Sequence, residues 1–139
     1  MGKNVTVNYT WQYGASFSAS PELQTLAEGW YVDGTEVIFA CGGTICDSIF
    51  AAAGANDGYV VGVDVDQSGA SDTVITSAMK ELAVSVQQIA QKMVDGKWSE
   101  VGGNCVTLGA ADGDTGLPTA AGSWRFKTFT VAEYEAMFN

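Results

Sequence analysis

Short apolar runs and helically spaced apolar residues alternate along the chain, and residues 36–67 show this most clearly. Glu36 to Cys41 is a short apolar run, which the turn Gly42-Gly43-Thr44 interrupts. Ile45 to Ala53 has apolar residues at helical spacing, and Tyr59 to Val63 is a second short apolar run. Two such runs joined by a helix predict a βαβ unit with parallel strands.

The same patterns continue on both sides of this unit. Further strands are predicted at residues 5–9, 74–77 and 105–108, and further helices at residues 21–32, 79–94 and 131–138. Ser20 followed by Pro21 is typical of a helix start. The helix over 79–94 has an apolar stripe that we expect to face the core, formed by Leu82, Val86, Ile89, Ala90 and Met93.

Strands that alternate with helices predict an α/β fold. We expect three layers, with a parallel sheet, helices on both of its faces and right-handed crossovers. The chain has 139 residues, of which 47% are hydrophobic. This is the size of one domain with a real core, so residues 1–139 are predicted to form a single α/β lobe.

The charge balance narrows the choice of partners. Sixteen acidic and six basic residues give a net charge of −10. Such a surface repels phosphate backbones and anionic lipids, which argues against a nucleic-acid partner and against a membrane surface. No apolar run is long enough to cross a bilayer. The first residues lack the apolar core of a signal peptide, so we expect the chain itself to be soluble.

The chain has no histidine. This excludes Ser-His and Cys-His nucleophile pairs and the commonest zinc ligand. Cys41, Cys46 and Cys105 match no zinc or redox spacing, and we interpret them as small packing residues. A Cys41–Cys46 disulfide stays open as an alternative. We therefore expect neither a cofactor nor a metal.

Candidate site residues follow the predicted strands. In open α/β sheets, ligands bind beyond the carboxyl ends of the strands. The first of these positions is Gly42-Gly43-Thr44, where bare backbone and helix N–H groups could meet a ligand. The alternative is a tight turn that needs a positive φ angle.

Asp64 and Asp66 follow the second strand of the βαβ unit. A carboxylate there is well placed to accept hydrogen bonds from the hydroxyl pair of a sugar. Paired carboxylates are also found in glycoside hydrolases and magnesium sites, and a solvated loop is the simplest alternative. Lys80 lies at the start of a predicted helix, where a cation is mildly unfavourable. It could pair with Asp64 or donate to a ligand hydroxyl, or it could be an ordinary exposed lysine.

Three aromatic residues, Trp11, Tyr13 and Phe17, lie in the loop after the first predicted strand. They could stack on a planar ring or a sugar face, or they could cover the edge of the core. Because every one of these candidates follows a strand, all of them could converge on one end of the sheet.

Several stretches, in this order along the chain, carry a family resemblance: Val7-Asn8-Tyr9, Gly14-Ala15-Ser16-Phe17, VIFACGGT at 37–44, VGVDVDQ at 61–67, TSAMK at 76–80 and Gly116-Leu117-Pro118. The chain resembles the basic membrane protein family of ABC-transporter substrate-binding lipoproteins, in the purine nucleoside receptor group. The resemblance runs over nearly the whole chain. It implies one lobe, the C-terminal one, of a periplasmic-binding-protein-like (type 1) fold, without the second lobe, the signal peptide and the lipid-anchor cysteine.

The resemblance also implies a function, which is non-catalytic capture of a nucleoside outside the cell for an ABC permease. It implies that Phe17 stacks on the base, that Asp64 grips the ribose hydroxyls with help from Lys80, and that Gly42 and Gly43 line the cleft. Trp11 and Tyr13 add bulk near the stacking position. The ligand could therefore be another nucleoside or a different small solute.

A single lobe would expose its half of the cleft and the surface that meets the other lobe. We therefore expect the isolated lobe to form a homodimer through this surface. The rival functions are the ligand-sensing domain of a transcription regulator, a small hydrolase that uses Asp64 and Asp66, and a redox protein that uses Cys41 and Cys46.

Overall fold

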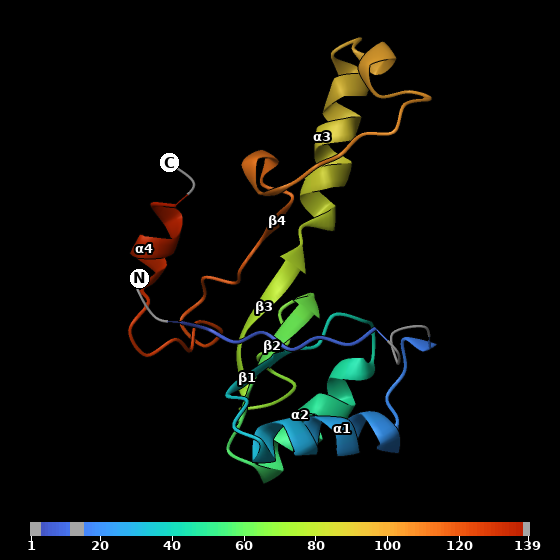
Figure 1. Cartoon of the computed structure of the whole chain (residues 1–139). Coiled ribbons are helices and arrows are strands. Elements are labelled where there is room, and N and C mark those ends of the chain that lie inside the picture. The colour runs from blue at the N-terminus through green and yellow to red at the C-terminus, as the bar shows by residue number, and fades with distance from the viewer. Residues whose placement is uncertain (1–3, 12–15, 138–139) are drawn as a thin grey trace.

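The computed structural model describes residues 4–11 and 16–137 and shows a mixed α/β chain (Figure 1). Its helices are α1 (Pro21–Val32), α2 (Ile45–Ala55), α3 (Leu82–Val94) and α4 (Val131–Glu135), with short 3-10 helices at Trp98–Glu100 and Ala110–Asp112. Its strands are β1 (Val37–Phe39), β2 (Tyr59–Asp64), β3 (Val74–Lys80) and β4 (Thr115–Gly116).

The four strands form one mostly parallel sheet in the order β1-β2-β3-β4. β1 pairs with β2 and β2 pairs with β3 in parallel, whereas β4 is antiparallel to β3. The predicted βαβ unit is therefore confirmed as β1-α2-β2. Because β1, β2 and β3 run in the same direction, their carboxyl ends meet at one edge of the sheet.

The local signals at the start of α1 are also confirmed. The Ser20 side chain accepts a hydrogen bond from Leu23 N at 3.2 Å, and Pro21 is the first helical residue. Ser48 of α2 ties the two helices together, because its hydroxyl donates to Ser20 O at 3.0 Å and accepts from Ser20 N at 2.9 Å. The Tyr31 hydroxyl at the end of α1 donates to Tyr59 O at 2.8 Å.

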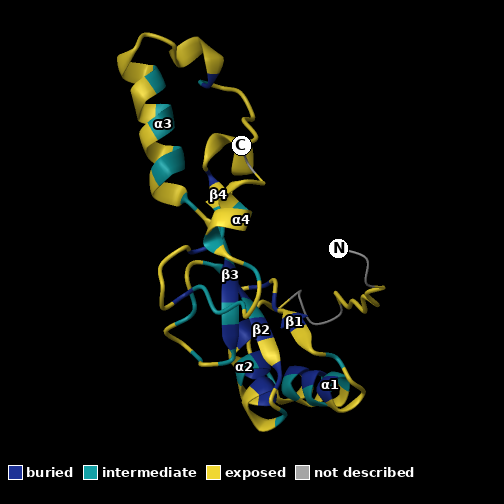
Figure 2. Cartoon of the chain, turned by 90° about the vertical axis from the view of Figure 1, so that its left-hand side faces the viewer, coloured by how far each residue is buried: buried dark blue, intermediate teal, exposed yellow. Residues whose placement is uncertain are grey.

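The core lies between the sheet and the pair α1 and α2. Its buried side chains come from these two helices, from β1 and β2, and from the turn that follows β1: Leu23, Ala27, Tyr31, Ile38, Ala40, Ile45, Cys46, Ile49, Ala52, Ala53, Val60 and Val63. Figure 2 shows the buried residues concentrated in this part of the chain. Each buried Val, Leu or Ile side chain stabilises the fold by about 1.5–3 kcal/mol.

The expected helices on both faces of the sheet are not found among the described residues. α1 and α2 pack together on one face, while Val37 and Phe39 of β1 point away from them and are exposed. α3, whose apolar stripe was expected to face the core, extends beyond the carboxyl end of β3 (Figure 1). It starts there because β3 continues to Lys80 and Glu81 N then donates to Asp114 O at 2.8 Å.

The burial predicted for α3 is therefore wrong. The helix exists, but it starts at Leu82 rather than at residue 79 and has no buried residue. Of its predicted core stripe, Leu82, Val86, Ala90 and Met93 are exposed and Ile89 is half-buried. The helix is amphipathic, as its spacing predicted. Helical spacing predicts which side of a helix is apolar, but it does not predict which element covers that side.

Two predicted strands do not form. Residues 4–11 and 105–108 have no strand structure, and Val5, Val7, Tyr9 and Val106 are exposed. β1 pairs directly with β2, while β4 and the bond from Arg125 N to Ile75 O occupy the outer edge of β3. The outer edge of β1 has no partner strand among the described residues, so strand propensity alone does not bring residues 5–9 to it. α4 is also shorter than predicted, since it ends at Glu135.

Candidate ligand-binding site

Asp64 and Lys80 form an ion pair at the carboxyl ends of two neighbouring parallel strands. Asp64 ends β2 opposite Met79 of β3, so that Lys80 follows one position later. Lys80 Nζ lies 2.6 Å from Asp64 Oδ1. The pair that the sequence suggested is thus present, although Lys80 ends a strand and does not open a helix.

The pair stays accessible to a ligand. The side chain of Lys80 is 61% exposed and that of Asp64 is 43% exposed. The hydrogen bond to Asp64, and then the attraction of its charge, raise the pKa of Lys80 above its usual value. Lys80 therefore stays an ammonium group, and the site offers an anionic acceptor beside a cationic donor.

The glycine turn after β1 holds the backbone of Phe17. Thr44 donates both its N–H (3.1 Å) and its hydroxyl (3.2 Å) to the carbonyl oxygen of Phe17. Gly43 has a φ angle of 53°, and a Cβ atom there would lie 2.8 Å from the same oxygen. The turn therefore needs glycine both for its conformation and for this close approach. Because the Phe17 carbonyl takes up the Thr44 donors, the turn positions an aromatic residue.

Phe17 itself is well placed for stacking. Its φ angle is 50°, and 61% of the residue is exposed. The Cδ1 atom of its ring lies 3.5 Å from where a Cβ of Gly42 would be. The ring is therefore fixed beside the end of β1, at the same edge of the sheet as Asp64 and Lys80.

Asp66 belongs to a different group of side chains. Its carboxylate accepts from Ser123 Oγ at 2.5 Å and from Ser68 N at 3.0 Å. Burial acts to raise the pKa of Asp66, but these hydrogen bonds outweigh it and the pKa is lowered. Asp66 connects the loop after β2 to the segment around Ser123, so its carboxylate is already in use.

Arg125, which the sequence analysis missed, fastens the same loop. Its guanidinium donates to the backbone carbonyls of Ser71 (3.0 Å), Val74 (3.1 Å) and Ser68 (3.0 Å). Arg125 is one of only six basic residues, and this scarcity was the available signal. The loop between β2 and β3 is thus held from the outside by Arg125.

Of the remaining aromatic candidates, Trp11 lies within the described residues and Tyr13 does not. Trp11 is exposed and stacks on Tyr9, with 5.7 Å between the ring centroids. Of the two aromatic candidates among the described residues, Trp11 and Phe17, it is Phe17 whose backbone the turn after β1 holds.

The cysteines do not form the disulfide that was left open. Cys41, Cys46 and Cys105 are all free, and because Cys41 and Cys105 are exposed, the packing role predicted for these two is wrong. Cys46 is buried, and its thiol donates to Ala40 O at 3.3 Å. Burial raises the pKa of Cys46, as expected for a packing residue. Within residues 4–11 and 16–137, no cluster of His, Cys, Asp or Glu is suited to hold a metal ion.

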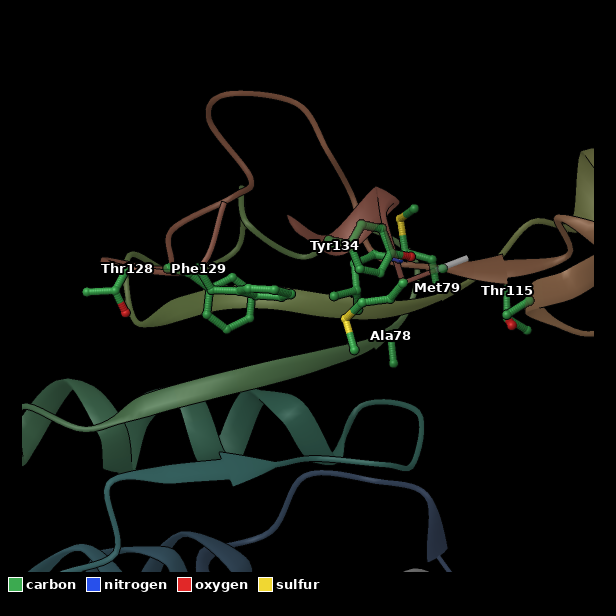
Figure 3. A pocket seen from close by; sticks show the side chains of 11 residues that line it. Ala78, Met79, Thr115, Thr128, Phe129 and Tyr134 are labelled. Carbon is green, nitrogen blue, oxygen red and sulfur yellow. The ribbon is translucent and has the colours of Figure 1, made fainter. Parts of the chain in front are cut away.

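A separate apolar cavity of about 810 Å³ lies beside β3 and α4 (Figure 3). Residues from β3, the 3-10 helix at Ala110–Asp112, β4 and the C-terminal segment line it: Ala78, Met79, Ala110, Thr115, Gly116, Leu117, Phe126, Thr128, Phe129, Tyr134 and Met137. The sequence patterns gave no prediction of this cavity. The dense aromatic residues between 124 and 134 were the signal, since Trp124 packs against Phe126, Phe129 and Tyr134.

Comparisons with known proteins show the family to which the chain belongs. The family model described as "ABC transporter substrate-binding protein PnrA-like" matches residues 2–134. The chain belongs to this family. Members of the PnrA-like family are binding proteins of ABC transporters, which agrees with the resemblance to basic membrane proteins.

Two relatives from the PnrA-like family illustrate the similarity. The ABC transporter nucleoside-binding protein BmpA of Lactococcus lactis subsp. cremoris is 33% identical over 129 residues, which cover 78% of this chain and 36% of the relative. Basic membrane protein B of Borreliella burgdorferi is 37% identical over 112 residues, which cover 78% of this chain and 33% of the relative. The chain thus spans about a third of the length of these relatives.

A solved structure supports the fold of this family member. An ABC transporter solute-binding protein from Aeropyrum pernix K1 superimposes with a TM-score of 0.55 at 22% identity. The match covers 84% of this chain and 35% of that one. Among the described residues, no helix has the length and apolar character needed to cross a membrane.

Proposed function

We propose that the chain is the C-terminal lobe of an extracytoplasmic solute-binding lipoprotein of an ABC transporter, with a type 1 periplasmic-binding-protein fold. Its ligand is a nucleoside or a similar small molecule that contains a sugar. The observation that carries the proposal is the exposed Asp64–Lys80 ion pair at the strand ends, at the same edge of the sheet as the exposed ring of Phe17.

The chemistry of a ribose fits this pair. Two neighbouring hydroxyls can donate to the Asp64 carboxylate, and one of them can also accept from the Lys80 ammonium. Hydrogen bonds to charged groups contribute about 1.5–3 kcal/mol each. Phe17 offers an exposed ring face on which a planar base can stack, which contributes about 0.5–1.5 kcal/mol beyond burial. Binding requires no bond making, so the function is non-catalytic.

The partners follow from this role. A second lobe closes over the ligand from the other side of the cleft, and an ABC permease receives the loaded protein. Lactococcus lactis BmpA, a relative at 33% identity, is a nucleoside-binding protein, and this supports the ligand class. One lobe alone encloses only part of the ligand, so the chain by itself should bind weakly.

An NMR titration with nucleosides suits such weak binding. We expect adenosine, guanosine, inosine or uridine to shift the signals of Phe17, Asp64 and Lys80. Asp64→Asn should weaken binding about tenfold, because it removes a charge-assisted acceptor. Asp33→Asn, an exposed residue at the end of α1, is the matched control and should leave the affinity unchanged.

A 2′-deoxynucleoside tests the ribose contact directly. It should bind more weakly than the ribonucleoside to the unmodified chain, and the difference should disappear in Asp64→Asn. If no nucleoside shifts these signals, the nucleoside assignment is wrong. If shifts occur but Asp64→Asn binds normally, the ligand class holds and the site lies elsewhere.

A further inference from the structure

Asp64 occupies an unusual backbone conformation. Its φ angle is 68°, and it is the middle residue of a three-residue turn in which Val65 N donates to Val63 O at 2.8 Å. Such a γ-turn with positive φ is rare and strained, and the left-handed region disfavours residues with a side chain. Strain of this kind persists only where the surrounding structure enforces it.

Gln67 supplies the main restraint on this turn. Its side-chain Oε1 reaches back and accepts a hydrogen bond from Val63 N at 2.8 Å. Its backbone N–H donates to Ser77 Oγ on β3 at 3.0 Å. Gln67 therefore connects the first residue of the Asp64 turn to β3.

The bond to Val63 N replaces a missing strand partner. On the β1 side of β2, Ala40 N donates to Val61 O at 3.2 Å. The Ala40 carbonyl that follows accepts from the Cys46 thiol instead of continuing the ladder. A buried N–H group without an acceptor is costly, and Gln67 Oε1 provides the acceptor at the point where β1 has ended.

Gly62 makes room for this arrangement. A Cβ atom at Gly62 would lie 2.5 Å from Gln67 Oε1 and 2.7 Å from Ser77 Oγ. Ser77 is fully buried, so its side chain cannot move away easily. Gly62 in β2 and buried Ser77 in β3 thus leave a close-fitting space for the Gln67 side chain.

We propose that Gln67 is a positioning residue, which holds the strained turn and thereby keeps the Asp64 carboxylate against Lys80. Gln67 acts through Asp64 and needs no contact with the ligand. The effect on ligand affinity rests on the proposed function, whereas the effect on the Asp64–Lys80 pair does not depend on it.

The test compares Gln67→Met, which keeps the length of the side chain but loses the acceptor, with Gln91→Met as the control. Gln91 lies on exposed α3, where its amide donates to Asp95. The first measurement needs no ligand, because NMR reports the pKa of the Lys80 ammonium. We expect that pKa to fall in Gln67→Met, as it does in Asp64→Asn, and to stay unchanged in Gln91→Met.

The second measurement is nucleoside affinity. Gln67→Met should weaken binding about tenfold, which is the usual effect of losing one buried hydrogen bond of this kind. In an Asp64→Asn background, the same change should have no further effect. A purely structural role would instead lower affinity equally in both backgrounds, and that result would overturn the proposal.

Three further outcomes each have a defined consequence. An unchanged Lys80 pKa in a folded Gln67→Met variant overturns the proposal, whatever happens to affinity. If Gln67→Met does not fold, Ser77→Ala takes its place, because it removes the acceptor for Gln67 N and should shift the Lys80 pKa in the same direction. If the unmodified chain binds no nucleoside, the proposed function fails, but the Lys80 measurement still decides the role of Gln67.

Discussion

Thr44 donates two hydrogen bonds, one from its backbone N–H and one from its hydroxyl, to the single carbonyl oxygen of Phe17. The two residues are 27 positions apart, so this contact fixes the loop after residue 15 onto the end of β1. It makes the glycine turn and the aromatic candidate one unit. Changes to the turn should therefore act on ligand stacking through Phe17.

Gly43→Ala is the sharpest test of this unit. The new Cβ would meet Phe17 O at 2.8 Å, and the φ angle of 53° disfavours alanine. We expect a loss of about 1–3 kcal/mol in the free energy of unfolding, together with weaker nucleoside binding. Gly69→Ala is the control, since nothing lies within 4 Å of its Cβ position. Equal stability of the two variants in urea denaturation would contradict the interpretation.

Tyr31 should make the fold sensitive to alkaline pH. Burial raises the pKa of Tyr31 from 10.0 to about 12, and its hydroxyl donates to Tyr59 O. Because the folded-state pKa lies above the unfolded value, the stabilisation is complete below pH 10 and is lost as pH rises towards 12. Tyr31→Phe should lose this part of the pH dependence, and exposed Tyr9→Phe should keep it. Urea denaturation across this range, with tyrosinate absorbance, provides the measurement.

Arg125 should matter for stability more than for affinity. Arg125→Met removes charge-assisted bonds to three backbone carbonyls, those of Ser68 and Ser71 in the loop between β2 and β3 and that of Val74 at the start of β3. We expect the free energy of unfolding to fall by about 2–3 kcal/mol. Exposed Lys97→Met removes the same charge without these bonds and should change stability little. A stability loss of equal size in both variants would point to net charge, rather than the hydrogen bonds, as the cause.

Because α3 is exposed, shortening an apolar side chain on α3 should cost less stability than shortening one in the core. Val86 on α3 is 69% exposed, and Ile49 on α2 is 5% exposed. Val86→Ala should change the free energy of unfolding by less than about 0.5 kcal/mol, whereas Ile49→Val should lower it by about 0.5–1.5 kcal/mol. A loss of more than about 2 kcal/mol for Val86→Ala would mean that the helix is buried in solution.

The parts of the fold that the sequence predicted correctly depend on local signals. Ser20-Pro21 starts α1, and Gly42-Gly43 separates β1 from α2, so neither needs information from distant residues. The pairing of Lys80 with Asp64 was one of the alternatives that the sequence left open, and it agrees with the rule that parallel neighbouring strands bring their carboxyl ends together. The sequence therefore predicted the βαβ unit, and the structure decided between the alternatives for Lys80.

The errors have a common physical cause. Residues 5–9 have the right alternation for a strand, and α3 has the right spacing for a buried face, but both lack a partner in the described structure. Contacts between distant residues were equally invisible. Asp66 and Ser123 are 57 positions apart, and no periodicity links them. Local pattern predicts the shape of a segment, and only the assembled chain determines what packs against it.

The distribution of the core has a consequence for how the chain folds and opens. All the residues of the main buried cluster lie between Leu23 and Val63. The contacts within β1-α2-β2 join residues that are close in sequence, and such contacts form quickly. We therefore expect backbone amides of α2 and β2 to exchange with deuterium only on global unfolding, while those of α3 exchange through local opening. The chain would then have a stable body that includes the paired strands β2 and β3, and an α3 region that opens independently of it.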